Sequence, residues 1–427
     1  MIVLPIEILS REFRSKLSIA KEIAQSGEKC ILVPNRYINS RFFSGCTILL
    51  KSAANFETKK LQKLRDFNNK LVVLDEEGIV HIERKEEAEI RFSQSSIDCL
   101  DQILFNGVSE YKIISECYDI SDRYRITGNP RFDRNTVSSS TEINKPILIT
   151  SRFGDVKPDQ EVEINKHVEN LGFSRDTNDE NILQEMFAYN EKLFEKFSDM
   201  VRALTRAFPS EKFIFRPHPS ESQSYWSDFF KYQKNTFVTK EEDIQHWLSR
   251  SKLHIHNGCT TAIEALITGV PTISYRPLKD DIYDLKIPNQ ISINAGSISE
   301  IIELVGDSNL SCDFYKGIDT AKEIIDNIDG KHSSAKLIAS LLIDIDRKQN
   351  NSTVKFKALS FYKSCKRLSI LMRSRNIRDQ YKYSIRKCDD FKKDKILNEI
   401  ASYIKLEKNA FQVKVKCPLI EISPSKI

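Results

Sequence analysis

The stretch that most constrains the fold of this chain is residues 252–277, KLHIHNGCTTAIEALITGVPTISYRP. A half-apolar strand is followed by a small polar loop and then by an apolar helical pattern at 261–268. Gly269 stands where a helix ends in a left-handed residue, and Pro271 prevents the helix from continuing into the apolar strand 272–275. This order predicts a strand–loop–helix–strand unit of a parallel sheet.

The loop of this unit predicts an anion-binding site. A polar loop that opens a helix at the carboxyl end of a strand presents backbone N–H groups and the positive end of the helix dipole. Gly258 permits close approach of a ligand, and Thr260 and Thr261 are expected to cap the helix and donate hydroxyl groups. Asn257 lies in the same loop, and Glu264 is placed to reach a ribose hydroxyl. The alternatives are an ordinary capped helix and, for Glu264, a solvated helix residue.

The length and composition predict a globular chain of two or three domains, with 427 residues, 40% hydrophobic and 29% charged. No apolar run approaches the roughly 18 residues of a membrane helix. The apolar start of the chain carries Glu7 and lacks the features of a signal peptide, so we expect a cytoplasmic protein. Nine scattered cysteines, without a C-x-x-C pair or a Cys/His cluster, predict reduced thiols and no structural metal site.

Charge is distributed unevenly along the chain. Residues 351–427 hold 19 Lys and Arg against 7 Asp and Glu, whereas the net charge of the whole chain is only +5. We expect this basic tail to form helices over 355–404. The alternatives are a solvated appendage, binding to nucleic acid, and an anchor on the anionic inner face of the cytoplasmic membrane, where each basic residue contributes about 1 kcal/mol. No nucleic-acid-binding motif supports the second alternative, so nucleic acid is not expected as a partner.

Two series of strand and helix patterns predict an α/β fold with two Rossmann-like lobes. The first series covers residues 1–136, a polar linker follows at 137–146, and the second series covers 147–350. Within the second series, residues 155–181 are highly charged and lack apolar periodicity, which predicts an inserted loop or lid, and 184–208 predicts a long amphipathic helix. Two lobes joined by a linker predict a cleft between them.

An acidic motif follows an expected strand of the first lobe, at the edge of an α/β sheet where ligands bind. Asp75, Glu76 and Glu77 precede Gly78, whose turn is tight. One of these carboxylates, directed into a cleft, is a candidate general base or nucleophile. The alternative is a solvated acidic turn.

A second motif follows an expected strand of the second lobe. Two prolines bracket His218 and fix its backbone beside Arg216, an arrangement suited to a phosphate or a leaving-group oxygen. The alternative is a Pro-rich turn with an incidental histidine. The usual signatures of dinucleotide redox enzymes, P-loop ATPases, serine hydrolases and zinc proteases do not occur. An Asp-x-Asp at Asp344 and Asp346 lies in an expected helix without the context of a donor site, which favours metal-independent chemistry.

Five short motifs in order resemble the bacterial surface carbohydrate biosynthesis protein family. They lie within residues 1–285 and read PIEILSREF at 5–13, DEEG at 75–78, TGNPRFD at 127–133, RPHP at 216–219 and HNGCTT at 256–261. The acidic cluster, the His-Pro pair and the Thr-rich helix start also resemble GT-B glycosyltransferases that use CMP-activated ulosonic acids, such as bacterial sialyltransferases and Kdo transferases. The tail from residue 351 lies outside the resemblance.

The resemblance implies a GT-B-like fold and a metal-independent glycosyltransferase of capsule or lipopolysaccharide synthesis. The donor would be a CMP-ulosonate such as Kdo or a sialic-acid-like sugar, and the acceptor a glycan or a lipid-linked sugar, with no cofactor besides the nucleotide sugar. A CMP donor leaves a single phosphate, which a histidine and a helix N-terminus can neutralise. A basic helical extension would hold the enzyme at the inner face of the membrane.

The resemblance also implies roles for particular residues. The catalytic carboxylate would be Glu76 or Glu77, with Asp75 the third acid of the motif. The residues implied for the nucleotide and its phosphate are Arg216, His218, Asn257, Gly258, Thr260, Thr261 and Glu264, and those implied for the acceptor or the cleft are Glu7, Ser10, Arg11, Asn129 and Arg131. Three alternatives remain: a UDP-sugar epimerase, suggested by Gly128-Asn-Pro130, a polyol-phosphate transferase, and a non-catalytic component of a polysaccharide assembly complex.

Overall fold

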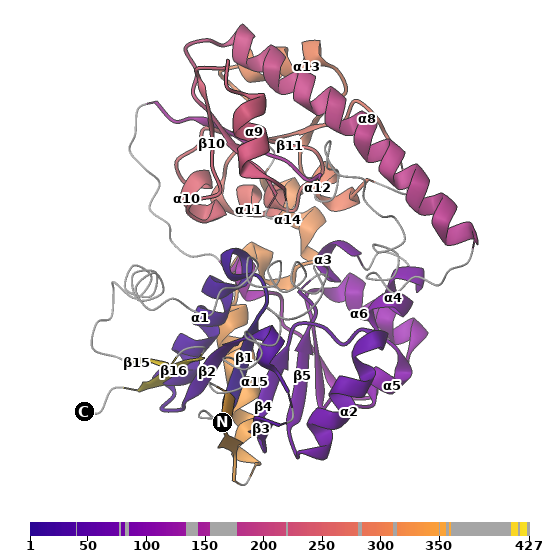
Figure 1. Cartoon of the computed structure of the whole chain (residues 1–427), viewed down its shortest axis with the longest axis vertical. Coiled ribbons are helices and arrows are strands. Elements are labelled where there is room, and N and C mark those ends of the chain that lie inside the picture. Colours follow the sequence, from indigo (N-terminus) through magenta and orange to yellow (C-terminus); the bar gives the residue numbers. More distant parts are fainter. Residues whose placement is uncertain are drawn as a thin grey trace, which may run out of the picture. The chain divides into compact units, whose positions relative to one another are not determined.

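The computed structural model describes residues 1–39, 41–76, 78–81, 85–133, 144–153, 177–218, 221–280, 284–310, 314–349, 351–355, 358–359, 411–416 and 419–424. Contacts divide the chain into two compact units (Figure 1). Unit 1 comprises Met1–Arg134 and Lys322–Ile427, and unit 2 comprises Asn135–Ala321. Among the described helices, none combines the length and the apolar character needed to cross a membrane.

Unit 1 is built on a sheet in which six neighbouring strands, β2 to β7 in the order below, are parallel. The strand order is β15-β16-β2-β1-β4-β5-β6-β7. The parallel strands are β1 (Ile2–Ile6), β2 (Cys30–Pro34), β4 (Thr47–Leu50), β5 (Lys70–Leu74), β6 (Gln102–Phe105) and β7 (Tyr124–Ile126). Most of these segments are continuous apolar runs, as expected of parallel strands that are covered on both faces. The chain passes from β1 to β2 on one side and then to β4 on the other, which makes the β1–β4 boundary a topological switch point.

The helices of unit 1 cover both faces of this sheet. One face packs against an apolar cluster that includes residues of α1 and α15, and a second cluster covers the other face. The helices are α1 (Leu9–Gln25), α2 (Thr58–Asp66), α3 (Gly78–His81), α4 (Lys85–Arg91), α5 (Gln94–Ile97), α6 (Val108–Cys117) and α15 (Ser334–Arg347), with short 3-10 turns η1 (Asn35–Tyr37), η2 (Asn55–Glu57), η3 (Pro130–Phe132) and η4 (Asp326–Asp329). The second lobe expected from the sequence extends to residue 350, whereas the contacts place 322–349 in unit 1, because the apolar face of α15 packs against α1 and this sheet.

The TGNPRFD motif anchors this returning segment to unit 1. Asn129 donates its backbone N–H to Asn327 Oδ1 at 2.9 Å, and Asn327 Nδ2 donates to Asn129 O at 3.0 Å. Asp133 accepts from the backbone of Ser334 at 2.7 Å and of Ala335 at 2.9 Å, and so caps the start of α15. The motif therefore joins segments that lie about two hundred residues apart in the sequence.

Gly128 is the residue of this motif that tolerates substitution least. Its φ is +70°, and a Cβ there would stand 2.1 Å from Asn327 Oδ1. We expect Gly128→Ala to destabilise unit 1 by about 3 kcal/mol or more, since it combines a left-handed alanine with the loss of buried hydrogen bonds. Gly27→Ala is the matched control, because Gly27 has φ +84° and nothing within 4 Å of the Cβ position, and it should cost about 1 kcal/mol. Equal losses in denaturant unfolding would contradict the role of Asn327.

The end of the basic tail is a hairpin, which corrects the expectation of an entirely helical extension. Strands β15 (Phe411–Lys416) and β16 (Leu419–Pro424) pair antiparallel, and β16 pairs antiparallel with β2 at the edge of the sheet. A further short strand, β14 (Thr353–Val354), pairs antiparallel with β3 (Phe43–Ser44). The helices expected over 355–404 lie almost entirely outside the described residues.

Unit 2 is built on a six-stranded, entirely parallel sheet of order β10-β9-β8-β11-β12-β13. The strands are β8 (Ile147–Thr150), β9 (Phe213–Arg216), β10 (Thr236–Val238), β11 (Leu253–His256), β12 (Thr272–Tyr275) and β13 (Ile293–Ala295). The helices are α8 (Thr177–Ala207), α9 (Gln223–Phe229), α10 (Ile244–Leu248), α11 (Thr261–Thr268), α12 (Lys286–Gln290), α13 (Ile298–Gly306) and α14 (Phe314–Lys322). The strand–loop–helix–strand unit predicted at 252–277 is confirmed as β11, α11 and β12.

The start of helix α8 differs from the position expected from the sequence. Helix α8 begins at Thr177, so residues 177–181 are helical and not part of the expected loop 155–181. The rest of that loop, and most of the expected linker 137–146, lie outside the described residues.

Candidate functional site

The topological switch point of unit 2 lies between β8 and β11. The chain passes from β8 to β9 and β10 on one side and then returns to β11 on the other. Parallel sheets bind ligands outside the carboxyl ends of the strands at such a point. The residues that leave β8 and β11 there are Ser151 and Arg152 on one strand and Asn257 and Gly258 on the other.

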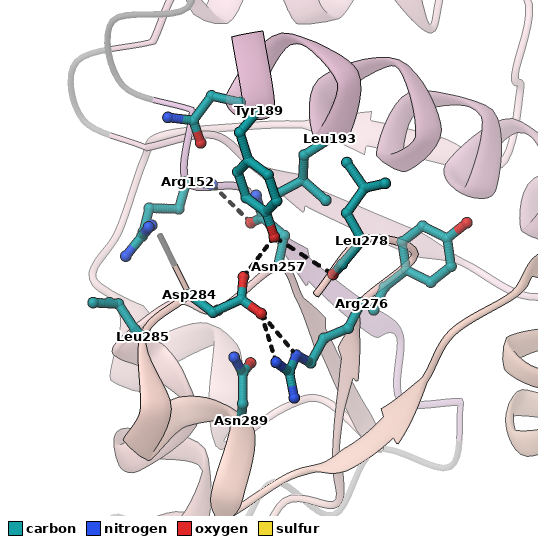
Figure 2. Close-up of a pocket in the computed structure, with 12 residues that line it drawn as sticks. Arg152, Tyr189, Leu193, Asn257, Arg276, Leu278, Asp284, Leu285 and Asn289 are labelled. Atoms are coloured by element: carbon teal, nitrogen blue, oxygen red, sulfur yellow. Dashed lines mark hydrogen bonds and ion pairs between the residues drawn. The ribbon is translucent and has the colours of Figure 1, made fainter. Parts of the chain in front are cut away.

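A pocket opens at this edge (Figure 2). It contains Arg152 and Asn257 from the two strand ends, Tyr189 from α8, and Arg276 and Asp284 from the segment after β12. The empty space in the pocket is about 340 Å³, including the part that is open to solvent. An adjoining hollow shares Arg276 and Asp284 with it, so polar and charged groups continue along the same edge.

Two hydrogen-bond donors in this pocket have no partner in the described part of the chain. Asn257 is 6% exposed, and its Oδ1 accepts the backbone N–H of Arg152 at 2.9 Å, which leaves Nδ2 buried without an acceptor. The guanidinium group of Arg152 makes no hydrogen bond or ion pair with the other described residues, and burial lowers its pKa. A buried donor without an acceptor is costly, so Asn257 Nδ2, with the guanidinium of the half-buried Arg152 nearby, points to a ligand with acceptor oxygens.

The opposite wall of the pocket is a chain of hydrogen bonds that centres on Asp284 (Figure 2). Tyr189 donates its hydroxyl to Asp284 Oδ1 at 2.7 Å, and Arg276 donates to Oδ2 through NH2 at 2.5 Å. Burial raises the pKa of Tyr189, and the Asp284 carboxylate raises it further, so the phenol stays protonated. These bonds fix the side chains of this wall, and Asp284 already neutralises the charge of Arg276.

The polar loop before α11 is held by a histidine of β11. His256 is fully buried, and its Nδ1 accepts the N–H of Gly258 at 2.9 Å and of Cys259 at 3.1 Å. Its Nε2 then carries the proton and donates to Ser292 Oγ at 2.9 Å. Burial lowers the pKa of His256 well below its usual range, and His254 and Arg152 lower it further, so the imidazole is neutral.

This arrangement changes what the loop can offer a ligand. The sequence predicts free N–H groups throughout the loop, but those of Gly258 and Cys259 bind His256. The expected cap is also wrong at Thr260, whose side chain makes no capping hydrogen bond, and Thr261 Oγ1 lies 3.2 Å from Cys259 Sγ. Asn257, which lines the pocket, is a residue of this loop with a buried donor that lacks an acceptor among the described residues.

The other residues predicted for the nucleotide lie at the same edge but do not line this pocket. Arg216 ends β9 and donates to Glu241 O at 2.7 Å, and His218 follows it, half-buried. Glu264 is 2% exposed, which excludes a solvated helix residue, and its charge acts on Arg216. The structure thus brings Asn257 and Gly258 into the pocket and leaves Arg216, His218, Thr260, Thr261 and Glu264 outside its lining.

The acidic motif of unit 1 contains a buried ion pair. Glu76 is 6% exposed, and its Oε1 accepts from Lys16 Nζ at 2.8 Å, with Lys16 only 1% exposed. Burial by itself would raise the pKa of Glu76, but Lys16, Arg11 and Arg131 outweigh it and the pKa is lowered. Glu76 is therefore a carboxylate that stays ionised at neutral pH.

The two acids beside Glu76 are in different situations. Asp75 is 1% exposed and is bound by the guanidinium of Arg91 and by the N–H of Gly78, which gives it a structural role. Glu77 lies outside the described residues. Among the described acids of the motif, Glu76 is thus the one beside a cluster of cations at the carboxyl edge of the sheet.

The residues predicted from the resemblance to contact the acceptor are in different surroundings. Glu7 pairs with Lys51 at 2.5 Å, and the charges of Arg11 and Arg131 act on Glu76, so these three surround the switch point of unit 1. Asn129 is fully buried, and its polar groups bind Asn106, Asn327 and Arg131 N, so it cannot contact an acceptor. Ser10 belongs to α1, and its side chain is not described.

Sequence reasoning missed Arg152, Tyr189, Arg276, Asp284 and Lys16. Arg152 lies two residues after β8 and Arg276 directly follows β12, so the rule that selected the other motifs, polar residues at strand ends, would also have selected them. Tyr189, Asp284 and Lys16 carry no such signal. Among the described residues, no group of three or more His, Cys, Asp or Glu side chains is arranged to hold a metal ion.

Comparison with known proteins gives evidence of fold alone. Neither a scan against models of protein families nor a search of curated protein sequences finds a match. A solved structure of the wall teichoic acid polymerase TagF soaked with CDPG is 10% identical and covers 81% of this chain and 89% of its own, with a TM-score of 0.50. A UDP-GlcNAc 2-epimerase from Methanocaldococcus jannaschii, in complex with UDP-GlcNAc and UDP, is 11% identical, with coverages of 80% and 99% and a TM-score of 0.46. By its two parallel α/β units the chain has a GT-B-like fold.

Proposed function

We propose that this chain is a glycosyltransferase that uses a nucleotide-activated sugar to build a bacterial surface polysaccharide. The observation that carries the proposal lies at the switch point of unit 2, where Asn257 Nδ2 is buried without an acceptor and the Arg152 guanidinium makes no hydrogen bond with the other described residues. A phosphate of the donor supplies the missing acceptor oxygens, and a guanidinium can bind it through two parallel hydrogen bonds. Charge that develops on the leaving phosphate is then stabilised by groups that are already in place.

Unit 1 contributes the carboxylate of Glu76. Because its pKa is lowered, Glu76 is a weak general base, and it is better suited to act as a nucleophile or to stabilise positive charge at the sugar carbon. Arg11 and Arg131, whose charges act on Glu76, are positioned to contact an anionic group of the acceptor. We retain Glu77, which the structure does not describe, as the other member of the motif that can fill the catalytic role.

The resemblance to the ulosonate-using enzymes makes a CMP-linked donor, such as CMP-Kdo or a CMP-sialic-acid-like sugar, the specific form of this proposal. The acceptor is then a glycan or a lipid-linked sugar of capsule or lipopolysaccharide, and the chemistry needs no metal. The basic residues between 351 and 410 would bring the enzyme to the inner face of the membrane.

A second candidate function is transfer of a polyol phosphate. The fold likeness to a teichoic acid polymerase soaked with CDPG supports it. This reaction also needs a phosphate-binding pocket in unit 2, so the two candidates differ in the donor and not in the pocket. A UDP-sugar epimerase is the third alternative, and UDP should then protect the fold better than CMP or CDP.

Thermal unfolding with CMP, CDP, UDP and GDP tests the proposal. Both tryptophans, Trp226 and Trp247, belong to unit 2, so their fluorescence reports on this unit. At about 100 times its dissociation constant, a bound nucleotide stabilises the folded state by about 2.7 kcal/mol. We expect CMP to give the largest shift, and Arg152→Ala to weaken its binding by about 10- to 100-fold, the effect of one lost charged hydrogen-bond donor.

Arg206→Ala is the matched control, because Arg206 is exposed on α8 of the same unit and should leave the shift unchanged. A larger shift with CDP would favour the polyol-phosphate transferase, and a larger shift with UDP the epimerase. If no nucleotide shifts the wild-type midpoint, or if Arg152→Ala binds as well as wild type, the proposed donor site is wrong.

A further inference from the structure

Glu221 is a buried carboxylate next to the proposed donor pocket that the chemistry of transfer does not use. It is 7% exposed and precedes α9. Its Oε2 accepts from Ser151 Oγ and from Trp226 Nε1, both at 2.7 Å, and its Oε1 accepts the N–H of Phe153 at 2.8 Å. None of the three donors to this carboxylate is a cation, which is unusual for a buried acid. Burial disfavours the ionised form of Glu221 and raises its pKa.

Two of these three bonds hold the segment that leaves β8. Glu221 binds Ser151 and Phe153, and Asn257 Oδ1 binds the N–H of Arg152 between them at 2.9 Å. Three consecutive residues are thus held by side chains from two other segments, one before α9 and one after β11. The segment itself belongs to neither helix nor strand, so these bonds set its conformation.

The same residue is bonded to the turn that carries the predicted phosphate ligand His218. The backbone N–H of Glu221 donates to His218 O at 2.9 Å. Glu221 therefore connects the exits of β9 and β8, which are neighbouring strands, and Asn257 connects the exit of β8 to that of β11. The three strand exits at this edge form one hydrogen-bonded row.

We propose that Glu221 is a positioning residue of the donor site, which holds residues 151–153 so that the Arg152 guanidinium is directed into the pocket. The proposal rests on the proposed function for the nature of the ligand, a nucleotide phosphate. It goes beyond that function because Glu221 contacts neither the pocket nor the ligand and acts through Arg152. Preorganisation of this kind lowers the cost of ordering a charged side chain on binding.

Glu221→Gln is the test, because glutamine keeps the shape but replaces one acceptor oxygen with an NH2 group that faces a donor. We expect the dissociation constant of whichever of CMP, CDP, UDP and GDP the wild type binds, measured by calorimetry, to rise about tenfold. We also expect faster amide hydrogen exchange in a peptide covering residues 147–153. The exchange measurement needs no ligand.

Trp226→Phe is the control for stability, because it removes only the third donor to Glu221 and leaves the bonds to Ser151 and Phe153. This variant should lose stability and yet bind as the wild type does. A cycle with Arg152→Ala separates positioning from a general structural effect. If Glu221 acts through Arg152, Glu221→Gln should not weaken binding further in the Arg152→Ala background.

The outcomes separate this proposal from the proposed function. Unchanged exchange at 147–153 in Glu221→Gln, or equal weakening of binding with and without Arg152, overturns the positioning role while the donor site stands. If the wild type binds none of CMP, CDP, UDP and GDP, the proposed function is contradicted, and the exchange rates still decide whether Glu221 holds the segment.

Discussion

Lys16→Met is expected to lower the stability of unit 1 by about 3–5 kcal/mol, the cost of leaving a buried charge without its partner. Lys16 Nζ and Glu76 Oε1 are 2.8 Å apart, and the two side chains are 1% and 4% exposed. Lys16 lies on α1, whose other inward residues, Phe13, Leu17 and Ala20, are apolar. Methionine has a similar length, so the change removes the charge without opening a large cavity.

Glu76→Gln and the double variant complete the experiment. The glutamine variant should also be destabilised, because the buried Lys16 then loses the carboxylate that it contacts, whereas the double variant should regain most of the loss. Both tryptophans lie in unit 2, so unit 1 is best followed by hydrogen exchange of peptides from β1 and α1 as urea is raised. Additive losses in the double variant would show that the two charges do not depend on each other.

This cycle also bears on function. If Lys16 and Glu76 are both needed only for stability, the double variant should fold and keep any transferase activity. If Glu76 acts on the sugar, the double variant should fold and be inactive. A folded, active double variant would remove Glu76 from the catalytic role and leave Glu77 as the remaining candidate of the motif.

Unit 1 is expected to lose stability as the pH rises from about 4.5 to 8, and Glu110→Gln should remove the part of this dependence that Glu110 causes. Burial, followed by the charge of Asp75, raises the pKa of Glu110 from an ordinary 4.5 to about 8. Between these values the folded protein holds a proton that the unfolded chain has released, so each rise in pH favours unfolding. At about 1.4 kcal/mol for each pH unit, the loss reaches up to about 5 kcal/mol near pH 8 and then stays constant.

The surroundings of Glu110 support this prediction. The carboxyl is 4% exposed, its Oε2 accepts from Asn106 N and Nδ2, both at 2.8 Å, and its Oε1 has no partner in the described part of the chain. Glu116→Gln is the control, because Glu116 lies on the same helix, α6, with an exposed side chain. The difference in unfolding free energy between wild type and Glu110→Gln should change with pH, and a constant difference would contradict the prediction.

Much of the fold followed from local patterns in the sequence. The pattern at 252–277 predicted the strand–loop–helix–strand unit β11, α11 and β12, and the Gly269 and Pro271 pair predicted where α11 ends and β12 begins. These signals are local, because a strand or a helix end depends on a few neighbouring residues. The hairpin β15–β16 could not be predicted in the same way, because its place at the edge of the sheet depends on β2, almost four hundred residues earlier.

The sequence by itself determined the two α/β units and the strand ends at which charged and polar residues gather. Only the tertiary structure decided which of those residues meet. Arg152 and Asn257 are 105 residues apart, and they form one site because the strand order places β8 beside β11. Lys16 and Glu76 also meet only in the folded chain, and so do Asn129 and Asn327. Asn129 was expected to contact the acceptor, but its bonds to Asn327 give it a structural role. Strand order and helix packing result from burial summed over the whole chain, so no single stretch of sequence specifies these pairs.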